Sequence, residues 1–183
     1  MSATRRSLLA AAPALASTAT PAGASDPAPA FSDPAADPEV GELIRRAAAA
    51  HVALMRGDLG LYRSLIATSD DFTLMAPFGG EPRHGFDRSS EYRASTARFF
   101  RGAGTFDQEV VATYGSQSLV VLVTIERVRG EIGGLPEQDW ALRVTQVYRR
   151  DRDGWRLVHR HADPLANGVT LEHAAAITRG DTP

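Results

Sequence analysis

Two histidines and an aspartate stand at alternate positions in the stretch "WRLVHRHADP", near the end of the chain. On a β-strand, His159, His161 and Asp163 would share one face with Trp155 and Leu157, and neighbours on that face would lie about 6.5–7 Å apart. A histidine pair at that separation can bind one metal ion, with Asp163 as a third ligand or as the group that orients a ring. Alternatively, one imidazole could transfer a proton near neutral pH, with Asp163 tuning its pKa.

A structural interpretation of the same stretch stays open beside these two. In it, the histidines bond to neighbouring strands, Trp155 packs in the core, and Arg160 pairs with an acid such as Glu126 on an adjacent strand. The chain has no cysteine and no HExxH helix, and a metal usually draws a further ligand from elsewhere. We therefore expect no metal and no cofactor, and we name the two histidines and the aspartate as candidate catalytic residues.

A third histidine lies in a stretch with the spacing of an amphipathic helix. Apolar residues recur on one face between Val40 and Met55, and His51 is the only strongly polar member of that face. It could act as an acid, a base or a hydrogen-bond donor in a pocket, or it could be a buried residue bonded to a neighbour. His84 follows a Gly-rich turn, where a position at a pocket mouth and an exposed turn are both open.

In two pairs of polar residues, the alternation of side chains along a strand places the two members on opposite faces. Glu126 and Arg127 lie on opposite faces of one expected strand, as do Arg143 and Gln146 on another. The sequence does not say which member of each pair faces the interior. Because an arginine in an apolar interior is costly unless paired, Arg143 is a candidate for an anionic ligand or a buried ion pair.

The composition excludes several classes of function. The chain has 183 residues, 43% of them hydrophobic, which suits one domain of ordinary size. All 20 basic residues are arginine, so a Schiff-base or P-loop lysine is excluded, and the absence of cysteine excludes disulfides and thiol nucleophiles. The net charge of −2 creates no basic field, and no GxGxxG, GxxxxGK[ST] or GxSxG motif occurs. We expect no nucleic-acid partner.

The first 24 residues have the pattern of a bacterial export signal. A basic pair, Arg5 and Arg6, precedes an apolar stretch, and Ala22-Gly23-Ala24 resembles a cleavage site. The sequence "TRRSLL" resembles the twin-arginine motif. We therefore predict a periplasmic or secreted protein without a membrane anchor once residues 1–24 are removed. Residues 25–37, rich in proline, alanine and aspartate, are predicted to form a disordered linker.

The rest of the sequence predicts helices first and then a run of long strands. A helix begins at Asp37-Pro38 and stops at Gly57, and Asp58 caps a second, shorter one. The further predictions are a strand over 71–80 that breaks at Pro77, a helix over 86–100, and strands over 105–115, 118–130, 139–150 and 155–163. Helices segregated from an antiparallel meander define an α+β domain. A strongly curved sheet wrapped around three N-terminal helices would form a cone with a pocket at its open end.

Three motifs in residues 37–164 carry a family resemblance: "RGDLGLYRSL", "DDFTLMAPFGGEPRHG" and "RVTQVYRRDRDGWRLVHRHADP". With them the chain resembles the nuclear transport factor 2-like superfamily, a cystatin-like roll, and most of all its SnoaL-like bacterial group. The last motif is also similar to the hub domain of calcium/calmodulin-dependent kinase. Ketosteroid isomerases of this superfamily place a tyrosine and an aspartate where this chain has Ala50 and Ala76. The resemblance therefore does not carry over the steroid-isomerase mechanism, but it implies dimerisation through the outer face of the sheet.

These observations predict an exported SnoaL-like domain, residues 38–166, followed by a tail, 167–183. We expect it to bind a small apolar or anionic molecule in the cone and to form a homodimer. The alternative is a small acid/base enzyme of the isomerase, lyase or hydrolase type, in which His51, His159 or His161 carries the proton. The residues expected to surround the hollow are His51, Tyr62, Met75, Phe78, His84, Glu126, Arg143, Tyr148 and Trp155.

Overall fold

The computed structural model describes residues 37–166 and 168–181. The predicted export signal and all but the last residue of the predicted linker lie outside the described residues. In chain order the elements are α1 (Pro38–Met55), α2 (Leu59–Leu65), β1 (Thr68–Met75), β2 (Arg83–His84), α3 (Ser90–Phe99), β3 (Phe100–Gly115), β4 (Leu119–Ile132), β5 (Gln138–Asp151), β6 (Gly154–Pro164) and α4 (Leu171–Thr178).

The first helices begin and end at the residues that the sequence indicates. Asp37 caps α1 by accepting a hydrogen bond from the amide of Glu39 at 2.8 Å, and Asp58 caps α2 through the amide of Leu61 at 2.9 Å. Between them the chain turns at Gly57, whose φ of 74° glycine adopts without strain. The predicted start of α1 and the break after it are confirmed.

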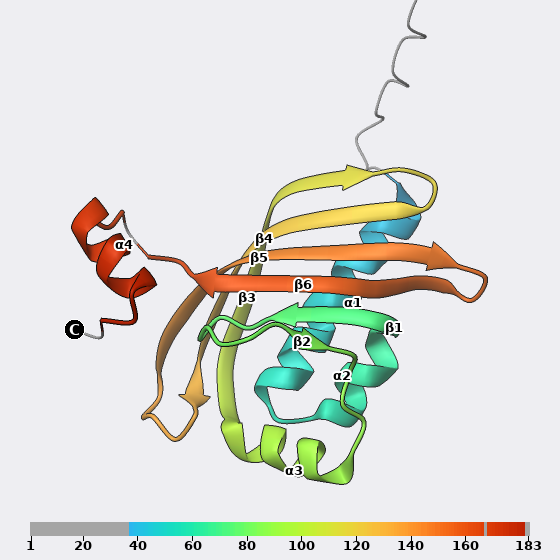
Figure 1. Cartoon of the computed structure of the whole chain (residues 1–183). Helices are drawn as coiled ribbons and strands as arrows, with labels where there is room; N and C mark the ends of the chain where they lie inside the picture. The colour runs from blue at the N-terminus through green and yellow to red at the C-terminus, as the bar shows by residue number, and fades with distance from the viewer. Residues whose placement is uncertain (1–36, 167, 182–183) are drawn as a thin grey trace, which may run out of the picture. The chain divides into compact units, whose positions relative to one another are not determined.

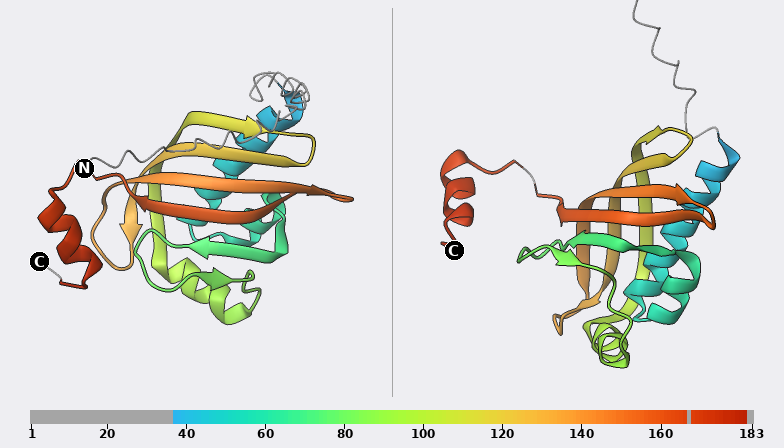
Figure 2. Two further views of the ribbon diagram at one scale, coloured as in Figure 1. Left: turned by 45° about the horizontal axis from the view of Figure 1, so that its top comes forward. Right: turned by 45° about the vertical axis from the view of Figure 1, so that its right-hand side comes forward.

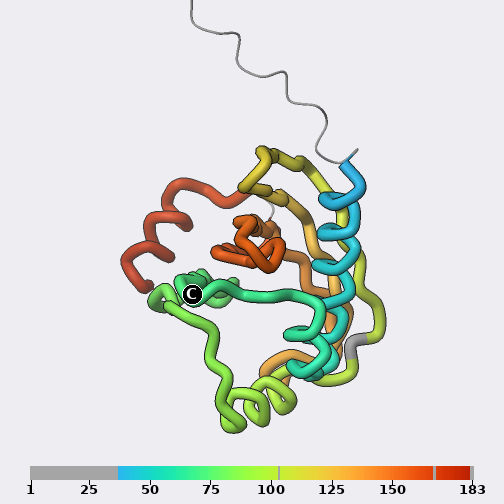
Figure 3. The backbone as a smooth tube through the Cα atoms, turned by 90° about the vertical axis from the view of Figure 1, so that its right-hand side faces the viewer, coloured from blue at the N-terminus to red at the C-terminus, as the bar shows by residue number. Residues whose placement is uncertain are grey.

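Six strands form one sheet in the order β2-β1-β6-β5-β4-β3. β1 runs parallel to β6, and the other neighbouring pairs are antiparallel. The sheet is strongly curved, with α1 and α2 along its concave side and α3 at one end, next to the start of β3 (Figures 1 and 3). Figure 2 shows the long strands bending around the helices. The predicted α+β class and the cone formed by a curved sheet around three helices are confirmed.

β4 shows how the sequence sets the two faces of this sheet. Its residues alternate strictly, so that Leu122, Thr124 and Glu126 are buried on the concave side while Val123 and Arg127 lie on the convex side. The concave side packs against α1, whose Ala47 and Ala50 are fully buried and let the helix approach the strands closely. The side chain of Glu126 therefore faces the hollow. Arg143 lies on the same face as Arg127 and does not.

β6 does not keep this alternation. Val147 and Tyr148 are consecutive on β5, but they pair with His159 and Leu157, so Val158 is an extra residue in the ladder. Leu157 is fully buried on the concave side, and beyond the bulge Arg160 and Ala162 take that side. The predicted common face of Leu157 with His159 and His161 is therefore wrong, because the bulge reverses the two faces between them.

The C-terminal segment, left open between a helical turn and disorder, contains α4. Thr170 caps it by accepting from the amide of His173 at 3.2 Å, and none of its residues is buried. Within the described ranges, no helix combines the length and the apolar character needed to cross a bilayer.

Candidate functional site

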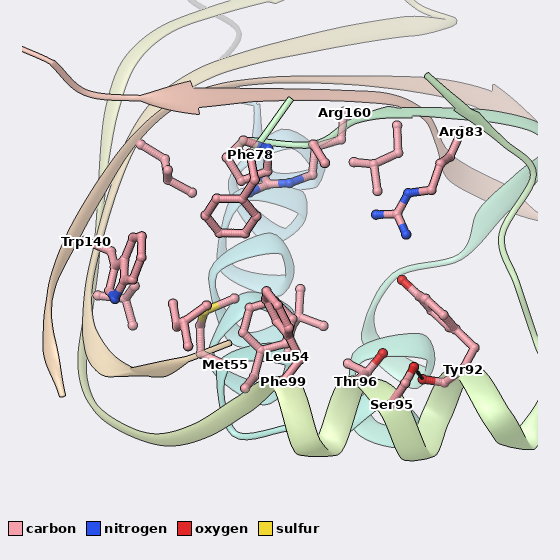
Figure 4. A pocket seen from close by; sticks show the side chains of 17 residues that line it. Leu54, Met55, Phe78, Arg83, Tyr92, Ser95, Thr96, Phe99, Trp140 and Arg160 are labelled. Carbon is pink, nitrogen blue, oxygen red and sulfur yellow. Dashed lines mark hydrogen bonds between the residues drawn. The ribbon is translucent and has the colours of Figure 1, made fainter. Parts of the chain in front are cut away.

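A cavity of about 330 Å³ opens between α1, α3 and the concave side of the sheet. Most of its wall is aromatic or aliphatic. The ring of Phe78, from the segment between β1 and β2, lies 5.9 Å from the ring of Trp140 and 6.0 Å from that of Phe99. Met55 and Leu54 of α1 complete the apolar floor (Figure 4). An apolar hollow of this kind is the usual form of a small-molecule site.

Besides the hydroxyls of Ser95 and Thr96, three long polar side chains reach this cavity from three different elements. Arg83 comes from β2, Tyr92 from α3 and Arg160 from β6. In Figure 4 the guanidinium of Arg83 and the hydroxyl of Tyr92 point toward one another, and Arg160 lies on the side of β6. Within the described residues, the lining contains no carboxylate, and Arg83 forms no ion pair.

Arg160 is held by a buried ion pair with Glu126. Nη1 donates to Oε1 at 3.0 Å and Nη2 to Oε2 at 2.8 Å, and the two side chains are only 10% and 4% exposed. Gln146 donates to the same Oε1 at 3.3 Å and accepts from the hydroxyl of Tyr148. Burial alone would raise the pKa of Glu126, but the charge of Arg160 lowers it below its usual range. The pair is therefore ionised at neutral pH and fixes the guanidinium at the cavity wall.

The predicted pairing of Arg160 with Glu126 is confirmed, with one difference in its path. The two residues are not on adjacent strands, because β5 lies between β6 and β4. Both long side chains reach across β5 on the concave face, where Gln146 lies directly opposite Arg160 and donates to Glu126. A bidentate arginine–carboxylate pair with an additional amide donor satisfies most of the polar atoms that the interior would otherwise leave unpaired.

A second cavity, of about 460 Å³, adjoins the first. Aromatic rings form much of its wall: Phe86 stacks on Tyr62 at 6.0 Å and lies 6.2 Å from Phe72. His84 and Asp87, both exposed, add polar groups to its lining. Burial raises the pKa of Tyr62 to about 12, so its hydroxyl stays protonated at neutral pH.

His51 is fully buried and lines neither cavity. Its Nδ1 lies 2.9 Å from the carbonyl oxygen of Ala47, which assigns the ring proton to Nδ1. The ring stacks on Phe106 at 6.3 Å and meets Tyr62 edge-on at 6.0 Å. Burial, and then the charge of Arg160, lower the pKa of His51 to about 4, so the ring is neutral at neutral pH.

A family model for the SnoaL-like domain matches residues 45–166. That range covers more than half of the chain and includes both cavities. The chain belongs to the SnoaL-like family. A comparison with curated protein sequences gives no significant match.

Solved structures with the same fold include three of different kinds. A ketosteroid isomerase-like protein from Erwinia carotovora atroseptica has 18% identity and a TM-score of 0.55, covering 72% of this chain and 99% of its own. A nuclear transport factor 2-like protein from Cytophaga hutchinsonii has 11% identity and a TM-score of 0.54, covering 70% and 100%. The calcium/calmodulin-dependent kinase II hub homology domain of Chlamydomonas reinhardtii has 15% identity and a TM-score of 0.51, covering 69% and 98%. At these identities the likeness establishes the fold alone.

The sequence resemblance matched two alanines of this SnoaL-like domain to the tyrosine and aspartate of ketosteroid isomerases. Ala50 is fully buried on the core-facing side of α1, and Ala76 lines the first cavity. Neither side chain can transfer a proton or donate a hydrogen bond. The hollow is kept in this domain, but the groups at those two positions are absent.

Three of the residues predicted to surround the hollow of the SnoaL-like domain line a cavity. Phe78 lines the first, and Tyr62 and His84 line the second. Glu126 and Tyr148 are buried behind the walls in the network that holds Arg160. They support the site and do not border it.

Most of the other predicted residues lie on the convex face. Met75 pairs with His161 on the neighbouring strand, and Thr73 accepts or donates a 2.7 Å hydrogen bond at Nδ1 of His159. Arg143 lies directly opposite Asp163. These side chains lie outside the cavity walls because the bulge in β6 turns the histidines and Asp163 outward, and strand pairing places Met75 and Arg143 beside them.

Trp155 also lies away from the cavities. It is partly buried against the core, and the guanidinium of Arg150 covers its ring at 4.5 Å. Within the described residues, no group of three or more His, Asp or Glu side chains is arranged to hold a metal ion. The pair of histidine rings, with centroids 6.5 Å apart, is engaged with Thr73 on one side and Asp163 on the other.

The polar residues that the cavity does present are not among those predicted from the sequence. Arg83 stands one residue before a predicted site histidine, Tyr92 lies on an ordinary amphipathic helix, and Arg160 lies between the two conspicuous histidines. One signal for Arg160 was present, because its proposed partner Glu126 shares a strand with strongly apolar neighbours. For Arg83 and Tyr92, which converge only through the tertiary fold, no comparable signal exists in the sequence.

Proposed function

We propose that this chain binds a small amphipathic anion in the hollow of its cone. The observation that carries the proposal is the convergence of Arg83, Arg160 and Tyr92 on an otherwise mainly apolar cavity whose described lining holds no carboxylate. Hydrogen bonds from a guanidinium to a carboxylate are charge-assisted and gain strength where apolar walls exclude water. The same walls would bury the hydrocarbon part of the ligand.

The two guanidiniums contribute differently to this site. The charge of Arg160 is compensated by Glu126, so Arg160 offers N–H groups at a fixed position with little net charge. Arg83 is exposed at the cavity and has no ion pair within the described residues, so it supplies the positive charge that favours an anion over a neutral molecule. Tyr92 adds a hydroxyl that can donate to the same group.

Isothermal titration of the full chain with 4-phenylbutyrate and with 4-phenylbutanol tests the proposal. The two probes share their apolar part and differ in charge, and we expect the anion to bind more tightly. In Arg83→Ala, the affinity for 4-phenylbutyrate should fall at least about tenfold, because a hydrogen bond to a charged group contributes about 1.5–3 kcal/mol. The affinity for 4-phenylbutanol should change little.

A matched control removes an arginine that does not face the cavity. Arg143 lies on the convex side, 3.7 Å from Asp163, and Arg143→Ala should leave both affinities unchanged. Equal binding of the two probes by the unmodified chain would contradict an anion site. So would an Arg83→Ala variant that binds 4-phenylbutyrate as tightly as before.

Binding is better supported than the alternative of an acid/base enzyme. Of the histidines named for proton transfer, His159 and His161 are on the convex face, and His51 is sealed in the core with a lowered pKa. The groups left in the cavities that could move a proton include Asp87 and His84, which are exposed, and Tyr92, which is half-buried. No pair of them is joined by a hydrogen bond within the described residues, whereas acid/base sites usually couple such groups.

Homodimer formation through the convex face of the sheet is the second part of the proposal. Val121, Val123 and Ile125 of β4 lie half-buried on this face beside Val147 of β5. Acidic residues and arginines flank the apolar strip, and some of them form ion pairs, such as Arg127 with Glu109 at 2.9 Å. A patch with an apolar centre and balanced charges can pair with a copy of itself about a two-fold axis.

Export is proposed from the sequence alone. Residues 1–24 have the features of a signal, with Arg5 and Arg6 before the apolar stretch. Expression with the native N-terminus in a bacterial host, followed by N-terminal sequencing of the periplasmic product, should give a chain that begins at Ser25. Replacing both arginines with lysine should block export if the twin-arginine route is used. A periplasmic product that still begins at Met1, or no exported product, would contradict the signal.

A further inference from the structure

The two cavities share part of their lining. Five residues line both of them, and each comes from a different element: Leu54 of α1, Leu74 of β1, Arg83 of β2, Tyr92 of α3 and Arg160 of β6. These five shared side chains lie at the boundary between the two cavities, and we call that boundary the waist. We call the cavity with Trp140 the first chamber and the cavity with Phe86 the second chamber.

The polar groups are concentrated at this waist. Three of its five members carry hydrogen-bond donors, the guanidiniums of Arg83 and Arg160 and the hydroxyl of Tyr92, and Figure 4 shows them gathered on one side of the first chamber. Beyond the waist, the first chamber is lined mainly by rings and aliphatic chains such as Phe99 and Trp140, together with the hydroxyls of Ser95 and Thr96. The second chamber has aromatic rings in its wall, among them Phe86, and the polar side chains of His84 and Asp87.

We infer that the ligand carries its anionic group between two apolar arms and not at the end of a single chain. This inference rests on the proposed function, because it assigns the anion to the arginines at the waist. A carboxylate there would have the rings of the first chamber on one side and those of the second, such as Phe72 and Phe86, on the other. Each chamber, at about 330 and 460 Å³, exceeds the roughly 150 Å³ that holds a benzene ring in a protein interior. The ligand class is therefore an α-branched carboxylic acid with two ring-sized substituents.

Glu126 explains why the waist can accept a single negative charge. It already neutralises Arg160, so Arg83 provides the one uncompensated cation among the described residues that form the waist. A monoanion satisfies that charge, whereas a dianion would bring a second, uncompensated charge between two chambers with many apolar wall residues, at a desolvation cost. The geometry therefore favours a carboxylate over a phosphate monoester dianion.

Two isomeric probes separate the branched from the linear arrangement. Diphenylacetate carries two phenyl rings on the carbon next to its carboxylate, whereas biphenyl-4-ylacetate has the same atoms and charge but places the carboxylate at the end of one long arm. In isothermal titration of the full chain, diphenylacetate should bind about tenfold more tightly, because each of its rings enters a chamber while the anion stays at the waist. Equal affinities, or tighter binding of the linear isomer, would overturn the inference.

A variant that fills the second chamber gives an independent readout. His84 is exposed at that chamber and lines no part of the first, so His84→Trp should reduce the affinity for diphenylacetate about tenfold and leave that for biphenyl-4-ylacetate unchanged. The linear isomer thereby reports that the variant is folded. Unchanged binding of diphenylacetate, or an equal loss for both isomers, would contradict the two-chamber assignment. If both isomers bind and Arg83→Ala changes neither affinity, the proposed anion site itself is contradicted. That outcome is distinct from the one that contradicts only the two-chamber assignment.

Discussion

At the scale of single residues, the interior of this domain is unusual in burying a charged pair beside a neutral histidine. Arg160 contacts Glu126 through two hydrogen bonds, and Nδ1 of His51 lies 3.8 Å from the same carboxylate. The carboxylate already has donors from Arg160 and Gln146, and the proton on Nδ1 of His51 is directed to the carbonyl of Ala47. Protonating His51 would add a cation next to Arg160 in a site that excludes water, which is why its pKa is low.

The ion pair should be costly to break but replaceable as a unit. Glu126→Gln leaves the Arg160 charge buried without a counterion, and we expect it to lower the free energy of unfolding by about 3–5 kcal/mol, measured by urea denaturation. The double variant Glu126→Leu with Arg160→Met removes both charges and should recover most of that loss. Glu109→Gln, which breaks an exposed pair with Arg127, is the control and should cost no more than about 1 kcal/mol. A similar cost for Glu126→Gln and Glu109→Gln would show that the buried pair is not desolvated.

His51 should make the stability of the domain fall as the pH drops below neutrality. Its pKa is about 6.5 in the unfolded chain and about 4 in the folded one, so the unfolded state binds the proton first. Stability is therefore full above pH 6.5 and is lost progressively between pH 6.5 and pH 4, by up to about 3 kcal/mol. Burial also lowers the pKa of His159, which adds a loss of the same sign.

Urea denaturation at several pH values checks this dependence. His51→Gln removes the titrating group, and the slope of stability between pH 6.5 and pH 4 should become clearly smaller than in the unmodified chain. His173→Gln changes an exposed histidine of α4 and should leave the slope as it was. An unchanged slope in His51→Gln would assign the acid sensitivity to other groups.

At the scale of elements, the sequence predicts the type and order of the main helices and strands because their caps and alternation are local signals. Asp37 and Asp58 mark helix starts, and the alternation in β4 continues without interruption from Leu119 to Ile132. The prediction that was wrong concerns which residues of β6 share a face. The bulge at Val158 depends on how β6 pairs with β5, and nothing in the residues around Val158 indicates it. One extra residue moved the two histidines out of the hollow and brought Arg160 in.

The cavity depends on a similarly non-local arrangement. Arg83 and Tyr92 are nine residues apart in the sequence, on β2 and α3, and they meet Arg160 only because β6 pairs in parallel with β1. The curved sheet could be predicted from the sequence, as could the positions of Phe78, Tyr62 and His84 near the hollow. Which arginine faces inward could not, because that choice is fixed by strand register and not by composition.

The turn between α1 and α2 should tolerate no side chain at its glycine. A Cβ on Gly57 would lie 2.8 Å from Cα of Ala97 and 3.0 Å from the carbonyl oxygen of Phe100, both backbone atoms, and the residue has a φ of 74°. Gly57→Ala should therefore lower the free energy of unfolding by the backbone strain, about 1–2 kcal/mol, plus a steric cost of about 1–3 kcal/mol.

Gly79 provides the matched comparison for this prediction. Its φ of 77° is nearly the same, but a Cβ added at that position would meet nothing within 4 Å. Gly79→Ala should thus show the backbone strain alone in urea denaturation. An equal loss in the two variants would show that the close approach of this turn to α3 and β3 adds nothing to the free energy cost of a side chain at Gly57.

At the scale of the whole domain, the curved sheet gives each of its faces a separate role. The concave face holds the helices, the ion pair and the two chambers, while the convex face exposes a strip of valines and isoleucine next to His159 and His161. Because the strands alternate strictly outside the bulges, a substitution on one face leaves the other face intact. Binding in the hollow and association through the sheet can therefore be tested independently.

Val123 lies in the middle of the convex strip on β4, and its substitution tests the proposed homodimer. Val123→Arg places a charge against its own copy across a two-fold axis, so sedimentation velocity should show a monomer under conditions where the unmodified chain is dimeric, with a dissociation constant raised about hundredfold. Leu61→Arg, at an exposed apolar position on α2, should leave the dimer unchanged. Affinity for 4-phenylbutyrate should be retained in both variants, since neither residue lines a chamber. A Val123→Arg chain that stays dimeric would place the interface elsewhere on the domain.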